Sequence, residues 1–304
     1  MQLFWHRRDL RASDNRGLAA AADSPGPTVP VFVFDDDVLD HGSDPRVRFM
    51  LDSLAELQER YRESGSNLVV ARGDPAAVLP VLAQALDAET VCWNEDYSGL
   101  AQERDGRVRD ALDRVGVARE THHDGQLHEP GTIRTNDGDP YQVYTYFWKK
   151  WRDREKPAPF AAPEAEALAD AETLAVEKLA RESDELADAL RADLPTIDAL
   201  GFADPEADVQ AAGTDAARER LETFCDERIF RYEDDREYPA KDGSSRLSPH
   251  LRFGTIGLRE VYAATEAAMA EAAERDEGED GTAAQDSVET FQSQLAWREF
   301  YTQV

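Results

Sequence analysis

Residues 244–254 have the sequence SSRLSPHLRFG. Two serines come directly before an arginine, and a third serine and a proline open a predicted helix. Hydroxyls, backbone amides and a planar guanidinium within five residues suit an anion such as a pyrophosphate. A serine-rich turn before a helix is also an ordinary N-cap, so this segment alone leaves both interpretations open.

A second segment, FQSQLAWREFY at residues 291–301, favours a ligand site. It places Arg298 and Glu299 among the aromatic rings of Trp297, Phe300 and Tyr301 on a predicted helix. A helix that served only a hydrophobic core would seldom contain both kinds of side chain.

The N-terminal part of the chain predicts an α/β fold. Short apolar runs are predicted as strands at 2–6, 29–34, 67–71 and 90–94, and helical patterns lie between them at 47–62, 76–86 and 100–115. Strands that alternate with helices predict a parallel, doubly wound sheet. No G-x-G-x-x-G comes after the first strand, which disfavours a dinucleotide-dependent dehydrogenase.

The first strand instead runs into WHRRDLRASDNRGL, residues 5–18. This segment resembles the opening of the DNA photolyase and cryptochrome family, W-F-R-x-D-L-R-x-x-D-N-x-A-L, with His6 and Gly17 as departures. The same family has a T/S-S-x-L-S turn followed by a W-R-E-F-Y helix. The resemblance implies an α/β antenna-type domain at 1–130, a connector at 131–205, and the first part of an all-α FAD-binding domain at 206–304.

Three further segments are similar to the family. They are NEDY at 94–97, GTIRTNDGDPYQVYTYFW at 131–148, and YEDDREYP at 232–239. The second marks the exit from the α/β domain, and Lys149, Lys150 and Arg152 after it are interpreted as a solvated helix face.

The resemblance also implies site residues. FAD would be held by Tyr232, Ser244, Ser245, Arg246, Leu247, Ser248, Phe291, Gln294 and Arg298. UV-damaged DNA would be contacted by Arg236, Gln294, Trp297 and Tyr301. Family members often hold an antenna chromophore, a folate or a deazaflavin, to which the sequence assigns no residues.

The implied reaction is that of a carbon–carbon lyase. Reduced FAD absorbs near-ultraviolet or blue light and donates an electron to a cyclobutane pyrimidine dimer, which splits and returns the electron. No general acid or base is needed, so no catalytic residue is predicted. Gln294 stands where dimer photolyases commonly have Glu, and Gln is common there in (6-4) photolyases and cryptochromes. A (6-4) photolyase and a cryptochrome-like blue-light receptor therefore stay as alternatives.

The composition is strongly acidic, with 63 Asp and Glu against 34 Lys and Arg and a formal net charge of -29. Such a surface is typical of a halophile, because concentrated salt screens the self-repulsion. Taken over the whole chain, the charge disfavours a nucleic-acid partner, but only a local stripe must touch phosphate.

Only Cys92 and Cys225 occur, and no stretch approaches membrane-spanning length. We expect reduced thiols in a cytoplasmic protein that has no membrane contact and no obligate protein partner. His122, His123, Asp124 and His128 have no second Cys or His pair at matching spacing, so a strand edge and loop are predicted rather than a metal site.

Two expectations concern how the parts join. Arg7, Asp9, Arg11 and Asp14 are predicted to form a salt-bridge network that ties the two domains together. Residues 157–193, rich in Ala, Glu and Asp, are predicted to be a partly helical linker that wraps the surface.

Family members continue for many helices after the W-R-E-F-Y segment. We therefore expect the 304 residues to be the first part of such a protein, with weak FAD binding and poor repair in isolation. An inactive truncated fragment and a non-flavin α/β nucleotide-binding protein remain as further alternatives.

Overall fold

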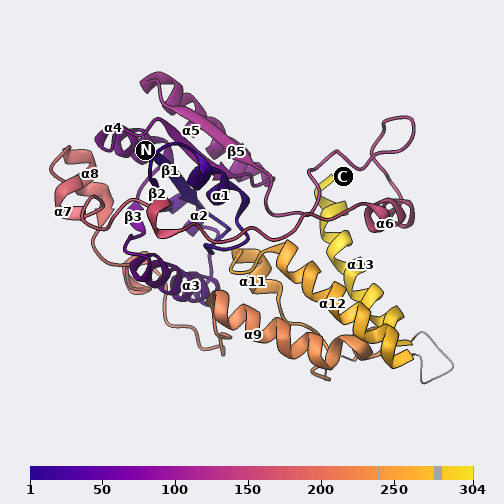
Figure 1. Ribbon diagram of the computed structural model, residues 1–304. Coiled ribbons are helices and arrows are strands. Elements are labelled where there is room, and N and C mark those ends of the chain that lie inside the picture. Colours follow the sequence, from indigo (N-terminus) through magenta and orange to yellow (C-terminus); the bar gives the residue numbers. More distant parts are fainter. Residues whose placement is uncertain (239, 277–282, 304) are drawn as a thin grey trace.

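The computed structural model of the chain describes residues 1–238, 240–276 and 283–303. Figure 1 shows an α/β unit built from the N-terminal part and a helical unit built from the C-terminal part. Pro239, the last residue of the YEDDREYP segment, lies outside the described residues.

The α/β unit contains a six-stranded sheet in the order β5-β4-β1-β2-β3-β6. Its strands are β1 Gln2–His6, β2 Thr28–Phe34, β3 Val69–Arg72, β4 Thr90–Asn94, β5 Ala118–His122 and β6 Leu190–Arg191. All neighbours pair in parallel except β3 and β6, which pair antiparallel. The predicted doubly wound parallel sheet is confirmed, and β6 is an edge strand that the sequence did not indicate.

Apolar side chains alternate between the two faces of this sheet. Leu3 and Trp5 of β1 pack on one face with helices α4 and α5, while Phe4 packs on the other with α1 and α3. The helices of this unit are α1 Arg16–Asp23, α2 Asp36–Leu39, α3 Asp44–Glu63, α4 Pro75–Ala85 and α5 Gly99–Val115. The period-2 pattern of the strands thus places a core on each face.

The segment predicted as a linker contributes to the sheet as well as to the surface. It is partly helical, as expected, with η1 Ala165–Ala167, α7 Val176–Leu179 and α8 Asp184–Ala189. Leu174, Leu179 and Leu186 are nevertheless buried in the same core as Leu3 and Trp5. Their sparse spacing in an Ala- and Asp-rich stretch hid this role.

The helical unit has a separate hydrophobic core. Its elements are α9 Gly213–Asp226, η3 Arg228–Arg231, α10 Tyr232–Asp235, α11 Ser248–Phe253, α12 Leu258–Asp276 and α13 Ala283–Gln303, preceded by η2 Asp198–Leu200. Helix α6, Tyr144–Asp153, also belongs here, because Phe147 and Trp151 are buried in this core. The connector thus divides its apolar residues between both units, and the domain boundaries at 130 and 205 stay a prediction.

Two of the motifs meet where the units join. The Leu10 N–H donates to the Phe253 carbonyl at 3.0 Å, and Arg8 Nε donates to the Arg252 carbonyl at 3.2 Å. Gly254 has φ +66°, and a Cβ there would overlap the backbone of Arg8. The glycine that ends SSRLSPHLRFG is therefore needed for the close approach of the N-terminal loop.

Candidate flavin and DNA site

The SSRLS turn joins α10 to α11, and the Ser245 hydroxyl within it accepts from the Leu247 N–H at 3.4 Å. Ser244 and Ser248 are exposed, Ser245 is half-buried, and Leu247 is 1% exposed and pins the turn to the helical core. Arg246 has φ +50°, which turns the chain sharply before the helix. The N-cap residue of α11, Leu247, makes no side-chain capping bond, and Pro249 in the first turn has no N–H.

Tyr232 and Phe291 lie together beside this turn. Tyr232 is half-buried and meets the Phe291 ring edge to face at 5.2 Å. Burial raises the pKa of the Tyr232 hydroxyl, and the Arg236 guanidinium lies 5.5 Å from the centre of its ring. Phe291 is 5% exposed and also packs on Phe224, so in this chain its ring is a core residue.

Helix α13 places the aromatic residues of WREFY against α6. Trp297 stacks on Tyr144 with centroids 3.6 Å apart and planes 9° apart, and Tyr301 lies 5.4 Å from Trp297 on the same helix. The Tyr144 hydroxyl donates to the Ser293 carbonyl at 2.6 Å, which fixes the stack. Gln294 is half-buried and donates to the Thr290 carbonyl and the Ser293 hydroxyl. The indole predicted to stack on a base is thus already covered by Tyr144 on one face.

Glu299 is the residue of this motif whose role the sequence did not reveal. Its carboxylate is fully buried and accepts hydrogen bonds from the Leu127 N–H, from Trp151 Nε1 at 2.7 Å and from His128 Nδ1 at 3.2 Å. Three donors from two distant segments bind one carboxylate, so Glu299 holds α13 against α6 and the loop after β5. A carboxylate four and three residues after the apolar Leu295 and Ala296 on a predicted helix was the available signal.

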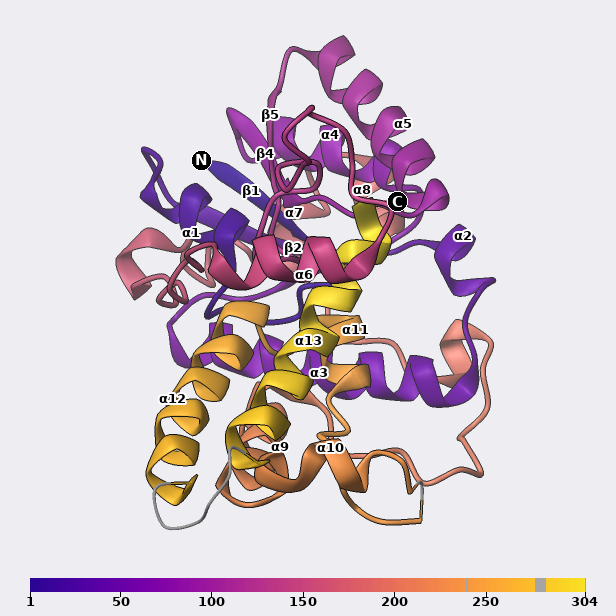
Figure 2. The ribbon, with the colours of Figure 1, turned by 90° about the vertical axis from the view of Figure 1, so that its right-hand side faces the viewer.

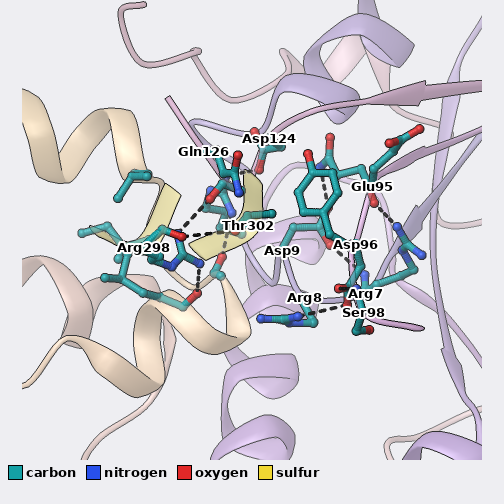
Figure 3. Close-up of a pocket in the computed structure, with 18 of the residues that line it drawn as sticks. Arg7, Arg8, Asp9, Glu95, Asp96, Ser98, Asp124, Gln126, Arg298 and Thr302 are labelled. Atoms are coloured by element: carbon teal, nitrogen blue, oxygen red, sulfur yellow. Dashed lines mark hydrogen bonds and ion pairs between the residues drawn. The ribbon is translucent and has the colours of Figure 1, made fainter. Parts of the chain in front are cut away.

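Arg298 faces a cleft of about 430 Å³ between the units. Figure 3 shows Arg298 and Thr302 on one side of this cleft and Arg7, Arg8, Asp96 and Ser98 on the other. Arg298 donates to the carbonyl oxygens of Gly125 at 2.8 Å and Leu251 at 3.0 Å. Burial, with further repulsion from nearby arginines, lowers its pKa to about 10. The structure therefore places Arg298 at the C-terminal half of α11, about one turn beyond Ser248.

A buried seam of ion pairs joins the two units. It consists of Asp14, Arg11, Asp124 and Arg259, each at most 3% exposed. Arg259 donates to Asp14 and Asp124 at 2.5 Å each, and Arg11 pairs with Asp124. Although burial opposes it, Arg11 and Arg259 hold the pKa of Asp124 below its ordinary value.

The predicted interdomain tie is therefore confirmed for Arg11 and Asp14. Arg7 and Asp9 act inside the α/β unit instead: Arg7 pairs with Asp105 at 2.6 Å, and Asp9 accepts from the side chain of Asn94 at 2.6 Å. Both contacts stay within the α/β unit because the two partners belong to elements next to β1. Asn94 ends β4, which neighbours β1 in the sheet, and Asp105 lies in α5, the helix after β4.

The histidines of β5 and of the loop after it have structural partners. His122 ends β5, and the Tyr97 hydroxyl lies 2.6 Å from His123 Nδ1. The predicted strand edge and loop are confirmed. Within the described ranges, no three His, Cys, Asp or Glu side chains converge as a metal site would require. None of the described helices combines the length and apolar character needed to cross a membrane.

A second, more apolar cavity of about 200 Å³ opens at the carboxyl ends of β1 and β2. Trp5, Phe34, Asp35 and Arg104 line it, and the exposed side chains of Val38 and Leu100 stand at its edge. One carboxylate oxygen of Asp35 is buried and has no hydrogen-bond partner in the described part of the chain, and burial raises the pKa of this group. Ligands of open α/β sheets bind at this edge.

Comparison with known proteins agrees with this arrangement. The family model of DNA photolyase matches residues 2–164, more than half of the chain. This chain belongs to the DNA photolyase family. Over its whole length it is 56% identical to a deoxyribodipyrimidine photo-lyase of Halobacterium salinarum, of which it covers 61%. It is 41% identical, over 98% of its length, to the enzyme of that name from a Synechococcus strain, of which it covers 59%.

A solved structure is also similar. It is an archaeal photolyase from Sulfolobus tokodaii, described with two FAD molecules and a proposed light-harvesting cofactor, with TM-score 0.71 and 27% identity over 99% of this chain and 58% of that one. The chain thus spans about three fifths of the length of the photolyases it matches. The individual flavin and DNA contacts assigned from the sequence stay predictions.

Proposed function

We propose that this photolyase-family chain serves in a light-driven DNA repair flavoprotein that splits cyclobutane pyrimidine dimers. The observation that carries the proposal is the turn before α11, in which Ser244 and Ser248 are exposed and Gly243 lies against Asp235, in the same short helix as the half-buried Tyr232. The relatives named as deoxyribodipyrimidine photo-lyases support the reaction. A cytoplasmic location is part of the proposal, because the substrate is cellular DNA.

The residues of the turn fit the phosphates of FAD. Free backbone N–H groups and hydroxyls at a helix start suit an anion, and Gly243 lies so close to Asp235 that a Cβ would overlap it. We infer that Ser244, Ser245 and Ser248 hold the pyrophosphate. Reduced and excited FAD, when bound, supplies the electron that opens the dimer. This chain would orient that cofactor and exclude water from it.

The apolar cavity beside β1 fits an antenna chromophore. An unpaired carboxylate oxygen on Asp35 calls for a donor, and a folate or deazaflavin ring carries N–H groups on a large apolar body. We infer that Asp35 and Trp5 would bind such a ring there. Cofactor extraction after denaturation, with Asp35→Leu as the variant, tests this assignment.

The decisive experiment is an absorption spectrum of the chain purified in molar salt and reconstituted with FAD. Weak flavin binding is expected from the 304 residues alone, and bands near one equivalent are expected from a chain extended to the length of its relatives. In both, binding should be lost in S244A/S245A/S248A and kept in Thr223→Ala, which removes an exposed hydroxyl on α9. Light-dependent repair of a thymine dimer, lost in Trp297→Ala while FAD is retained, would support the DNA assignment. A chain that stays colourless, alone and extended to the length of its relatives, would overturn the flavin proposal.

A further inference from the structure

The lysines of this acidic chain are concentrated on one short segment. Three of its five lysines lie within residues 149–156, KKWRDREK, which contain five basic residues and two acidic ones. The chain as a whole has a formal net charge of -29. The second half of α6 and the turn after it are therefore net positive in a strongly acidic chain.

Three of these cations have partners that explain them, and one of the three, Arg154, donates to the Thr132 hydroxyl at 2.9 Å. Arg152 pairs with Glu289 of α13 at 2.6 Å. Lys156 donates to the Arg152 and Arg154 carbonyls at 2.9 and 2.7 Å and lies over the Trp151 ring. Burial lowers its pKa to about 8. The Arg152 and Lys156 side chains thus serve the packing of α6.

Lys149 and Lys150 are different. Both are exposed, and no acidic side chain of the described residues lies within ion-pair distance of either. Asp153, one turn further along α6, is 74% exposed and 3.6 Å from Arg152. In a chain with almost two acidic residues for each basic one, two adjacent unpaired ammonium groups mark a surface that keeps its positive charge.

Exposed apolar side chains accompany these lysines. Val143 is 53% exposed, and Tyr146 is 60% exposed. Tyr146 precedes Lys149 by three residues and Lys150 by four, so the three side chains share the outer side of α6. We call Val143, Tyr146, Lys149 and Lys150 the α6 face. Cations next to an exposed aromatic ring are the usual composition of a nucleic-acid contact.

The α6 face lies beside the residue proposed to meet the damaged base. Figure 2 shows α6 crossing α13, and the crossing is held by Tyr144 on Trp297 and by Phe147 on Phe300, 5.4 Å apart. At the same crossing, Tyr301 is 73% exposed. A strand that delivered a base to Trp297 would pass along this side of α6.

We propose that the α6 face binds the phosphate backbone of the DNA strand that flanks the lesion. This inference rests on the proposed function, which supplies the DNA. Lysine ammonium groups are compact, mobile charges that neutralise phosphates without reading sequence, and Tyr146 adds a contact with sugar or base that salt does not weaken. Two phosphates are thus contacted by α6 itself, apart from the residues that hold the flavin.

The salt dependence of DNA binding tests this assignment. Affinity for a duplex with one thymine dimer is measured at several salt concentrations at which circular dichroism shows each variant folded. Each phosphate contact contributes a slope of about 0.9 in log affinity against log salt. K149A/K150A is expected to reduce the slope by about 1.8, whereas Tyr146→Ala lowers affinity with the slope unchanged.

The matched control is K178A/R181A. It removes the same charge from exposed residues at α7, which packs on the sheet of the other unit. An equal change of slope in this control would mean that net charge alone matters, and would overturn the proposal. An unchanged slope in K149A/K150A would overturn it while leaving the repair function intact. A wild-type chain with no affinity for damaged DNA would overturn both.

Two further outcomes would assign the α6 face to something other than DNA, either an acidic protein or the cofactor site. If poly-glutamate bound the chain through Lys149 and Lys150 while the DNA slope stayed unchanged, the α6 face would belong to an acidic protein. If K149A/K150A lost FAD as well as DNA affinity, α6 would act on the cofactor site. Either result would overturn a direct backbone contact.

Discussion

The seam between the units and the α6 face show two ways in which this acidic chain uses charge. In the seam, every carboxylate meets guanidinium or backbone N–H groups, and Asp14, Asp124 and Arg259 are at most 2% exposed. On the α6 face, Lys149 and Lys150 are exposed and form no ion pair with any acidic side chain of the described residues. Buried charges must be paired, because desolvation is costly, whereas solvated charges stay available to a ligand.

The largest effect is expected from breaking the seam. Arg259→Ala would leave Asp14 and Asp124 each without one buried donor, and we expect a loss of about 3–5 kcal/mol in the free energy of unfolding. Denaturant titration in molar salt measures it. Arg275→Ala, which removes an exposed pair with Glu271, should cost less than about 0.5 kcal/mol. Equal losses in the two variants would contradict the contrast between buried and exposed charge.

A second buried carboxylate sharpens the comparison inside the helical unit. Glu299→Ala would leave the Leu127 N–H and Trp151 Nε1 without an acceptor, at a cost of about 2–3 kcal/mol. Glu299→Gln keeps one acceptor oxygen and should lose less. Glu289→Ala, on the exposed side of the same helix, is the matched control and should change the unfolding free energy little. A Gln variant as unstable as the Ala variant would argue against the hydrogen bonds as the cause.

His250 lies between these two extremes, because it is buried but only one of its two ring nitrogens forms a hydrogen bond within the described residues. Nδ1 lies 2.8 Å from the Thr255 hydroxyl, and Nε2 is buried with no hydrogen-bond partner among the residues that the structure describes. Burial lowers the pKa of His250 to about 4. The folded state resists protonation that the unfolded chain accepts near pH 6.5, so stability falls as the pH drops from about 6.5 to 4. In His250→Asn this part of the acid loss, about 2 kcal/mol between pH 7 and pH 4.5, should disappear. Unfolding curves at pH 7 and pH 4.5 compare the two proteins, and an unchanged difference would refute the role of His250.

The smallest effect on stability is expected at the α6 face. K149A/K150A should change the free energy of unfolding by less than about 0.5 kcal/mol, because neither ammonium has an acidic partner among the described residues. Thermal unfolding in molar salt checks this. A loss above about 1 kcal/mol would show that these lysines support the fold, and would remove their contrast with Arg259.

Much of the fold was predictable because its signals are local. Apolar runs bounded by polar turns indicated β1 to β4, and the helices between them followed from their periodicity. The pairing of β6 was not predictable, because Leu190–Arg191 is a two-residue strand that acquires its structure only from the exposed edge of β3. The buried leucines of α7 and α8 were missed for a similar reason: the β1 residues they pack with lie more than a hundred residues earlier in the chain.

The candidate site divides in the same way. Motif spacing indicated the SSRLS turn and the WREFY helix, and the family membership of the chain is confirmed. The direction in which Arg298 points, the cover of Tyr144 over Trp297 and the burial of Glu299 depend on contacts with residues 125–151. Such contacts depend on how two helices cross, which no local pattern specifies.

The sequence by itself thus determined the family, the order of strands and helices, and the position of each motif, since these depend on residue types and short spacings. Only the tertiary structure decided which charges are paired. Arg11 and Arg259 are far apart in the chain yet share Asp124, while Lys149 and Lys150 have no such partner among the described residues. Pairing is a property of distance in space, and the desolvation cost that makes it necessary exists only where the folded chain excludes water.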